Sequence, residues 1–307
     1  MRTTIGIPTY NGFFRLNLLL SSIFNYTTEE ELKNIRIVVV DDGTPDREEE
    51  KRILGVCRKH NVMSLRHPQN RGISASWNTA TRYYSNAELI ILLNDDIQIC
   101  HPAWLKCLKY FFENNENIGH VSFSTFNLDP RTALPRPEQC IPDISANPWM
   151  SWTPGGQAFA FKKTIFDETE AGFPEKLLSF YEEGWFGYEL AFKGYLSYIL
   201  SFPIVQHWGS QTFGLNHELA FTTPIPELPM EKYRELLKPK FSDEKIEPQP
   251  GKVYRMEYSR VLFALKWGCK DYWDAPQNEI EERLRDKIEK RSIKWLDMDG
   301  NERQDLI

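Results

Sequence analysis

The segment LIILLNDDIQI, residues 89–99, decides the fold that this sequence predicts. Its first five residues are an unbroken apolar run, which is typical of a strand buried on both faces of a parallel sheet. Asn94, Asp95 and Asp96 follow directly, at the carboxyl end of that strand, where open α/β sheets bind ligands. Adjacent carboxylates repel each other unless a cation or hydrogen-bond donors offset the charge. The segment therefore indicates either a divalent-metal site or a polar turn that caps the next helix.

The residues before this segment alternate between apolar runs and amphipathic stretches. Runs of β-branched residues predict strands, and apolar residues that recur every three to four positions predict helices. We expect strands at 3–7, 35–40, 62–65 and 89–93, with helices at 13–24, 48–60 and 73–84. Such alternation is typical of parallel strands joined by right-handed crossovers. The predicted fold class is α/β, with a Rossmann-like, mostly parallel central sheet flanked by helices.

Polar clusters lie at the same edge of the predicted sheet. The sequence PTYNG occupies residues 8–12 and DDGTPD occupies 41–46, each after a strand; NRG occupies 70–72, before a helix whose amino terminus favours anions. Together these clusters suit a nucleoside diphosphate. An aromatic ring would pack on the base, carboxylates would accept from base and ribose donors, and Arg71 would pair with phosphate oxygens.

Composition and charge restrict the class of protein. Of 307 residues 41% are hydrophobic, and 43 acidic residues against 37 basic ones give a net charge of -6, which argues against a nucleic-acid acceptor without excluding one. The five cysteines are scattered and show no C-x-x-C spacing, so we expect free thiols in a reducing compartment. No apolar run approaches the roughly 18 residues of a membrane span. We therefore expect a cytoplasmic protein without a transmembrane segment.

These motifs resemble, in order and approximate spacing, those of the family 2 glycosyltransferases, which have the GT-A fold and include rhamnosyltransferase-like members. The resemblance runs from about Thr3 to about Phe213. It rests on PTYN at 8–11, VVDDGT at 39–44, NRG at 70–72 with Asn78, and LLNDD at 92–96. It implies a hexosyl- or deoxyhexosyltransferase that uses Mn²⁺ or Mg²⁺ and moves a sugar from a nucleotide-sugar donor to a hydroxyl-bearing acceptor.

The resemblance also implies roles for particular residues. The nucleotide-sugar would contact Pro8, Thr9, Tyr10, Asn11, Asp42, Asn70, Arg71, Asn78, Asn94, Asp95, Gly155 and Gly156. The metal would be held by Asp96 and Asp95, the last two positions of a D-x-D type motif in which Asn94 replaces the first acid. His207 resembles a late histidine of the family that approaches the metal or diphosphate. A purely structural role for His207 stays open, because a lone histidine often has one.

The general base is expected in the segment SFYEEGWFGYE, residues 179–189. In the family an acidic pair begins a helix here, and its second member removes the proton of the acceptor hydroxyl. Counting back from Gly194 assigns that role to Glu183, with Glu182 beside it. The later acid and arginine of the family pattern fall on Trp185 and Glu189, so Glu182 and Glu189 stay open as the base. A solvated helix start with no catalytic role is the other alternative.

The chain divides into a predicted domain and an extension. Residues 1–220 would form the GT-A domain, with 1–100 as its nucleotide-binding half and 101–220 as its acceptor-side half. Residues 221–307 would form a mainly helical extension of unknown role after a proline-rich linker. Its apolar stripe at Tyr254, Tyr258, Val261, Leu262 and Leu265 is expected to dock on the domain; peripheral contact with an anionic membrane or a partner protein is the alternative.

Two other functions compete with glycosyl transfer. A sugar nucleotidyltransferase uses a similar sheet with a nucleotide and Mg²⁺, but its expected G-x-G-x-R loop is absent, because PTYN follows the first strand. A degenerate protein that binds nucleotide-sugar or glycan without turnover would explain Trp185 and Glu189. The absence of a Q-x-x-R-W motif argues against a processive polysaccharide synthase.

Overall fold

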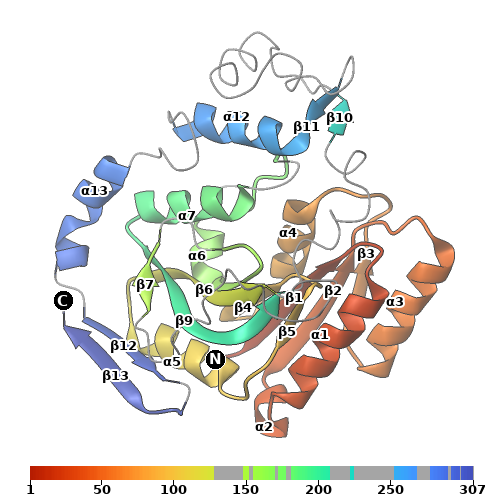
Figure 1. Ribbon diagram of the computed structural model, residues 1–307, viewed down its shortest axis with the longest axis horizontal. Coiled ribbons are helices and arrows are strands. Elements are labelled where there is room, and N and C mark those ends of the chain that lie inside the picture. Colours follow the sequence, from red (N-terminus) through yellow and green to blue (C-terminus); the bar gives the residue numbers. More distant parts are fainter. Residues whose placement is uncertain are drawn as a thin grey trace.

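The computed structural model describes residues 1–127, 148–151, 155–169, 172–177, 181–207, 222–224, 252–267, 277–289, 292–297 and 299–306. Within these residues a nine-stranded sheet runs in the order β3-β2-β1-β4-β8-β6-β9-β5, and β7 pairs with β9 (Figure 1). Helices cover both faces of this sheet. Two smaller sheets, β10-β11 and β12-β13, lie in the described part of the C-terminal region.

The first half of the sheet is parallel, as the sequence predicts. Its strands are β1 (Thr3–Thr9), β2 (Ile35–Asp41), β3 (Met63–Arg66) and β4 (Leu89–Leu93), and the helices between them are α1 (Phe13–Asn25), α3 (Arg47–Lys59) and α4 (Ile73–Tyr83). A short helix, α2 (Glu29–Leu32), follows α1 and has a capping box at Thr28 and Glu31, which the sequence analysis missed. Every residue of β1 and β4 is buried. The predicted α/β class is confirmed.

The second half of the sheet is mixed. Its elements are β5 (Ile97–Ile99), α5 (Trp104–Asn114), β6 (Ile118–Asn127), β7 (Trp149–Met150), β8 (Ala158–Lys162), α6 (Lys163–Asp167), α7 (Glu182–Phe192) and β9 (Leu196–His207). Strand β8 runs antiparallel to both β4 and β6, whereas β6 and β9 are parallel. Strand β5, which is too short to be recognised in the sequence, pairs with the end of β9 and sets Ile97 opposite His207. This pairing carries His207 to the acidic residues after β4.

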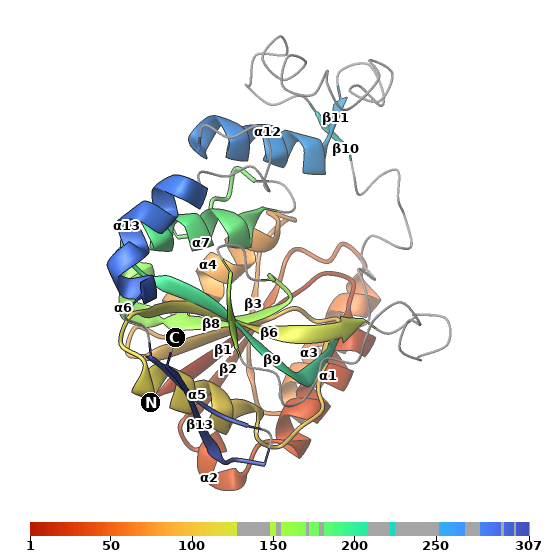
Figure 2. The ribbon, with the colours of Figure 1, turned by 60° about the vertical axis from the view of Figure 1, so that its left-hand side comes forward.

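The C-terminal region packs around the rest of the molecule. It contains β10 (Thr222–Pro224), β11 (Lys252–Tyr254), α12 (Arg255–Trp267), α13 (Gln277–Glu289), β12 (Ser292–Leu296) and β13 (Glu302–Leu306). Figures 1 and 2 both show α12 lying over α7 and α13 reaching the end of α7. The β12-β13 hairpin, which the sequence analysis missed, packs on α5, and the amide of Asn115 bonds both backbone groups of Lys294.

The predicted apolar stripe of the extension is partly wrong. Tyr258 is buried, but Leu265 is 37% exposed. Phe263 of the same helix has no exposed surface, because its ring packs against the aromatic residues of α7. None of the described helices is both long and apolar enough to cross a bilayer.

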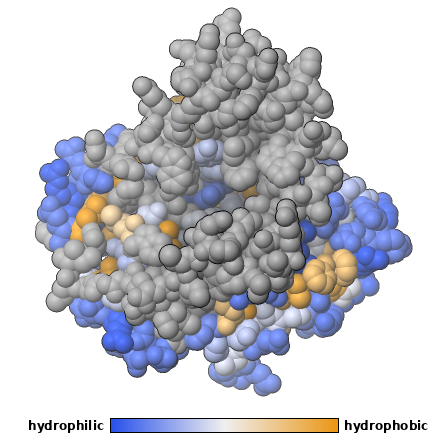
Figure 3. All heavy atoms as spheres, viewed as in Figure 1, coloured by the Kyte–Doolittle hydropathy of each residue, from blue (hydrophilic) through white to orange (hydrophobic). Residues whose placement is uncertain are grey.

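The described surface is mostly hydrophilic on the face drawn in Figure 3, and its apolar groups form separate small patches. The large apolar side chains that are exposed among the described residues are Phe14, Tyr26, Met63, Tyr83 and Leu265. They come from different elements, so they define no single apolar surface.

Candidate active site

Asp95 is the centre of a buried contact network at the end of β4. Its carboxylate accepts a hydrogen bond of 2.7 Å from the Thr9 hydroxyl at the end of β1. It also accepts from Arg15 of α1, with Nε 3.2 Å from Oδ1 and Nη2 3.4 Å from Oδ2. Burial raises the pKa of Asp95, and the charge of Arg15 opposes that rise. Asp95 therefore fixes β1, α1 and β4 relative to one another.

Arg15 is a site residue that sequence reasoning missed. It also donates from Nη2 to the carbonyl of Tyr10, 3.3 Å away, and so links the loop after β1 to Asp95. A signal was present, because Arg15 is the only charged residue in α1, and a lone cation in an otherwise apolar helix needs a partner.

Gly12 makes this network possible by its lack of a side chain. A Cβ atom at Gly12 would lie 2.0 Å from Oδ2 of Asp95 and 2.7 Å from the Thr9 hydroxyl. The backbone φ of Gly12 is -125°, which any residue adopts, so space and not conformation requires glycine. The neighbouring Asn11 has a φ of +51° and donates its backbone N–H to the Thr44 hydroxyl, 3.0 Å away.

Asp96 and His207 form the second part of the site. The β5-β9 pairing brings Nε2 of His207 to 3.3 Å from Oδ2 of Asp96, and both side chains are buried. Burial alone would raise the pKa of Asp96, but the hydrogen bond and charge of His207 hold it below its usual value. Within the described residues, Oδ1 of Asp96 has no hydrogen-bond partner. Its lone pairs remain available to a ligand.

Asp96 and His207 suit a hard divalent cation. Mg²⁺ and Mn²⁺ take oxygen and imidazole ligands, and Mg²⁺ commonly keeps several waters while it bridges one or two carboxylates to substrate phosphates. Among the residues that the structure describes, no group of three or more histidine, cysteine, aspartate or glutamate side chains gathers around one point. The protein would thus supply two ligands, with water and substrate completing the shell. The orphaned Oδ1 of Asp96 fits this arrangement.

Asp42 lies at the end of β2 and holds the loop that leads into α4. Its carboxylate accepts from the backbone N–H of Arg71 (3.0 Å) and of Gly72 (2.8 Å), and it lies 2.7 Å from Nδ1 of His67. Gly72 has a φ of +88°, a left-handed conformation that favours glycine. The structure thus gives Asp42, predicted as a donor contact, three partners of its own. His67 was missed because nothing in its local sequence points to Asp42.

Arg71 extends from that loop toward a segment near α7. Its Nη2 lies 2.6 Å from Oε2 of Glu175, and the two side chains are 46% and 39% exposed. Asn78 of α4 is buried and clasps the same segment, donating to the carbonyl of Phe173 (2.8 Å) and accepting from its N–H (2.9 Å). Asn78 also donates to Glu175, 3.2 Å away. Glu175 is a second neighbour of the site that sequence reasoning missed.

The acidic pair begins α7. Glu182 is 1% exposed, and its Oε1 has no hydrogen-bond partner among the described residues. Glu183 faces Gly156, where a Cβ atom would lie 3.0 Å from the Glu183 carboxyl carbon. Burial raises the pKa of both carboxyls, and repulsion by Glu183 raises that of Glu182 further. Glu189 accepts a 2.9 Å hydrogen bond from the Trp185 indole.

A chain of contacts joins the acidic pair to the end of β4. The backbone N–H of Asn94 donates to the carbonyl of Gln157, 2.9 Å away, and the adjacent Gly156 contacts Glu183. Gly155 precedes them in the same loop. The structure thus brings together the predicted residues after β1, β2 and β4 and before β8. Pro8 lies within β1, where it pairs with Val40, and the side chain of Asn70 is exposed.

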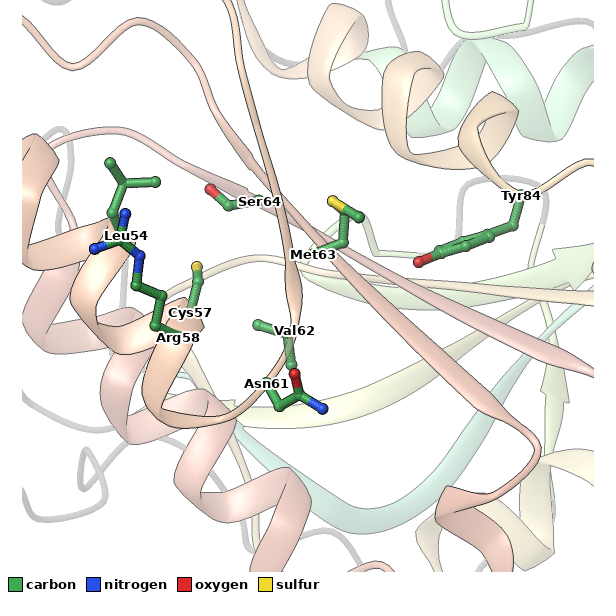
Figure 4. Close-up of a pocket in the computed structure, with 8 residues that line it drawn as sticks. All are labelled: Leu54, Cys57, Arg58, Asn61, Val62, Met63, Ser64 and Tyr84. Atoms are coloured by element: carbon green, nitrogen blue, oxygen red, sulfur yellow. The ribbon is translucent and has the colours of Figure 1, made fainter.

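A separate pocket lies elsewhere on the molecule. Figure 4 shows it between the end of α3 and the start of β3. Its volume is about 360 Å³. Its lining residues are Leu54, Cys57, Arg58, Asn61, Val62, Met63, Ser64 and Tyr84. The pocket lies at the amino end of β3, opposite to the carboxyl ends where Asp42 and Asp95 lie, and it contains no carboxylate. It is therefore not part of the site.

The mixed sheet, with acids at the carboxyl ends of its parallel strands, has the GT-A fold. The sequence matches the family described as Glycosyl transferase family 2 over residues 4–174, more than half of the chain. The chain belongs to this family. A curated relative, an uncharacterized glycosyltransferase of Rickettsia felis, is 26% identical over 126 residues. That match covers 41% of this chain and 20% of the relative, so the chain spans about a fifth of that protein.

Solved structures with the same fold include two complexes with nucleotides. S. aureus TarS 1–349 in complex with UDP is 15% identical and superposes with a TM-score of 0.56. The superposition covers 100% of this chain and 97% of that chain. The mannosyltransferase PcManGT from Pyrobaculum calidifontis, in complex with GDP-Man and Mn²⁺, is 15% identical and superposes with a TM-score of 0.52. The superposition covers 94% of this chain and 75% of that chain. At this identity the likeness shows the fold alone.

Proposed function

We propose that this protein is a metal-dependent, inverting glycosyltransferase, and that it transfers a hexosyl or deoxyhexosyl group from a nucleotide-sugar to an acceptor hydroxyl. One observation carries the proposal. Glu183, a carboxylate with a raised pKa, lies beside Gly156 and is linked through Gln157 and Asn94 to the acids after β4. This arrangement would bring the proposed base close to the proposed donor site.

The donor would bind along the loops after β1, β2 and β4. Tyr10 would pack on the base, and Arg71 would pair with the diphosphate. Asp95, whose oxygens already accept from Thr9 and Arg15, would reach the ribose only with its remaining lone pairs. Because the carboxylate of Asp42 and the amide of Asn78 already have protein partners, these two would act mainly by shaping the loop before α4 and the segment at Phe173. The complexes of neighbours with UDP and with GDP-Man support a nucleotide at this edge.

Asp96 and His207 would hold the divalent metal, Mn²⁺ or Mg²⁺. When bound, the ion neutralises the developing charge of the leaving diphosphate. Support comes from the orphaned Oδ1 of Asp96, from its contact with His207, and from the Mn²⁺ in the structural neighbour. Asp95 would contribute less to the metal, because Thr9 and Arg15 occupy its oxygens.

Glu183 would act as the general base. Its carboxylate would take the proton of the acceptor hydroxyl as that oxygen bonds to the anomeric carbon, while the bond from that carbon to the diphosphate oxygen breaks on the opposite face. Burial favours this role, since a carboxylate of raised pKa is a stronger base near neutral pH. Glu182 is 1% exposed whereas Glu183 is partly exposed, and Glu189 is bonded to Trp185; both observations favour Glu183.

The location and the domain roles are also proposals. Cys57, Cys100 and Cys107 are free thiols among the described residues, which supports a reducing, cytoplasmic location. Residues 1–100 would form the donor half and 101–220 the acceptor half.

Thermal unfolding with a panel of nucleoside diphosphates, with and without Mn²⁺, tests the donor site. We expect one nucleotide to stabilise the wild type only when metal is present, by about 2.7 kcal/mol at a hundred times its dissociation constant. Asp96→Asn should lose this response and still fold, because asparagine preserves the shape of the side chain. Absence of any nucleotide response in the wild type would contradict the proposed site. Release of pyrophosphate from a sugar phosphate and a nucleoside triphosphate would indicate a nucleotidyltransferase instead.

A further inference from the structure

The start of α7 has an unusual backbone. Tyr181, which precedes the acidic pair, has a φ of +71° and a ψ of -3°, the left-handed region that bulky L-residues rarely adopt. Such a conformation persists only where surrounding contacts impose it. It also sets the direction in which α7 begins, and therefore where Glu182 and Glu183 point. The question is what holds Tyr181 in place.

Phe263 of α12 packs directly against this turn. Its side chain has no exposed surface, and its ring centroid lies 5.7 Å from that of Tyr181 and 5.4 Å from that of Tyr188. It also lies 6.3 Å from Trp185, with the two rings edge to face. One side chain of the C-terminal region thus contacts the residue before the acidic pair and the two aromatic residues after it.

Trp267, also on α12, extends these aromatic contacts along α7. Its ring lies 5.7 Å from that of Tyr188, and it stacks on Phe192 at the end of α7 with 5.2 Å between centroids and 4° between planes. The two helices therefore meet along the length of α7, as Figures 1 and 2 show. The family match ends at residue 174, so neither α7 nor α12 lies within it.

We propose that Phe263 is a positioning residue of the transferase: its ring holds Tyr181 in the left-handed conformation, and this directs Glu183 toward Gly156. The C-terminal extension then completes the active site through α12 and is not a separate module. The inference rests on the proposed function, because it takes Glu183 to be the base. Phe263 touches neither donor nor acceptor in this arrangement, and its effect reaches the reaction only through α7.

Phe263→Leu tests this role. Leucine keeps an apolar group between the helices but loses the tilted ring contact with Tyr181. We expect kcat to fall about tenfold while the KM for donor and the affinity for the nucleoside diphosphate stay unchanged, since the donor loops lie on other elements. The matched control is Ile293→Val, another conservative loss of buried volume, located in β12 where it packs on α5. This control should keep the wild-type kcat.

A second substitution separates positioning from general stability. Asparagine adopts the left-handed region more readily than other residues except glycine. Tyr181→Asn should therefore restore most of the lost kcat when combined with Phe263→Leu, although it adds no packing between the helices. Equal kcat losses in Phe263→Leu and Ile293→Val, or no recovery in the double variant, would overturn the inference. Glu183→Gln, measured alongside, reports on the proposed base independently: if it retains turnover, the proposed function fails whatever Phe263→Leu does.

Discussion

The site has two groups of acids, which differ in how their carboxylates are held. We name them after their proposed roles: the donor edge is the group after β2 and β4, and the acceptor edge is the group at the start of α7. After β2 and β4, each carboxylate has hydrogen-bond or cationic partners: Asp42 has two backbone N–H groups and His67, Asp95 has Thr9 and Arg15, and Asp96 has His207. At the start of α7, Glu182 and Glu183 are adjacent, and burial raises the pKa of both.

This difference in partners and pKa indicates which chemistry each edge can perform. A carboxylate that stays ionised and partnered holds loops and binds cations. A carboxylate with a raised pKa takes up a proton near neutral pH and then releases it, as a general base must. The residue type is similar on both edges, so the surroundings assign the role. Four substitutions test this division, and the first has the largest expected effect.

Glu183→Gln should lower kcat by about 10²- to 10⁴-fold, because a glutamine amide cannot accept the acceptor proton. The nucleotide-dependent rise in melting temperature should remain, since the donor edge is unchanged. Steady-state kinetics and thermal unfolding of the same preparation measure both. Glu189→Gln is the matched control; it should keep kcat within a few fold, because Glu189 is bonded to Trp185. A larger loss in the control would move the base to Glu189.

Gly12→Ala should destabilise the donor edge by about 1–3 kcal/mol, because the new Cβ would lie 2.0 Å from the Asp95 carboxylate and must displace it. The response to nucleotide should weaken in parallel. Gly55→Ala in α3 is the control of opposite sign. Nothing lies within 4 Å of its Cβ, so alanine should stabilise the exposed helix by about 0.5–1 kcal/mol. Urea unfolding measures both, and equal effects would refute the claim that Asp95 is tightly enclosed.

The donor edge could be predicted from the sequence because its signals are local. The apolar run at 89–93 predicts a buried strand, and the acids that follow it must then lie at the carboxyl end. Because β1 pairs in parallel with β2 and β4, the polar clusters that follow these strands lie at the same edge of the sheet. What the sequence could not supply was the partner of each acid. Arg15 meets Asp95, and His67 meets Asp42, only through the way helix and strand cross.

The acceptor edge was less predictable because it depends on contacts between distant segments. Counting residues placed Glu183 at the start of a helix, and the structure has α7 begin at Glu182. The left-handed turn at Tyr181 has no sequence signal, since glycine or asparagine is the usual residue there. The orientation of α12 was misjudged for the same reason. Its stripe was chosen from the helical spacing of apolar residues, whereas the aromatic residues of α7 pack against Phe263.

Glu182→Gln tests the raised pKa of the acidic pair through stability. Because burial raises this pKa above its unfolded value, the folded protein binds the proton more tightly. The stability that the group contributes is full below the unfolded pKa and is lost as pH rises through the folded one. Glutamine stays neutral, so the variant should be more stable than wild type above neutral pH, by the order of 1 kcal/mol, and the gap should close toward about pH 5. Melting temperatures across this range measure it, and a gap that widens toward acid would contradict the raised pKa.

Glu175→Gln should have the smallest effect. It tests an ion pair that joins the two edges. Glu175 comes from the segment clasped by Asn78, near α7, yet its carboxylate pairs with Arg71 on the donor edge. If Arg71 binds the donor diphosphate, Glu175 competes for the same guanidinium. Removing its charge should then tighten nucleoside diphosphate binding about two- to fivefold, because a half-exposed ion pair contributes about 0.2–1 kcal/mol.

Whether the affinity for the nucleoside diphosphate rises or falls shows whether Glu175 competes for Arg71 or orients it. Glu168→Gln, an exposed acid that accepts from the Tyr195 hydroxyl, has the same change of net charge and should leave the affinity unchanged. Titration calorimetry at low and moderate salt compares the variants, and the gain should shrink as salt screens the charges. Weaker binding in Glu175→Gln would show instead that Glu175 orients Arg71 for the phosphate. The acceptor edge would then contribute to donor binding, and the division between the two edges would be less sharp than their electrostatics suggest.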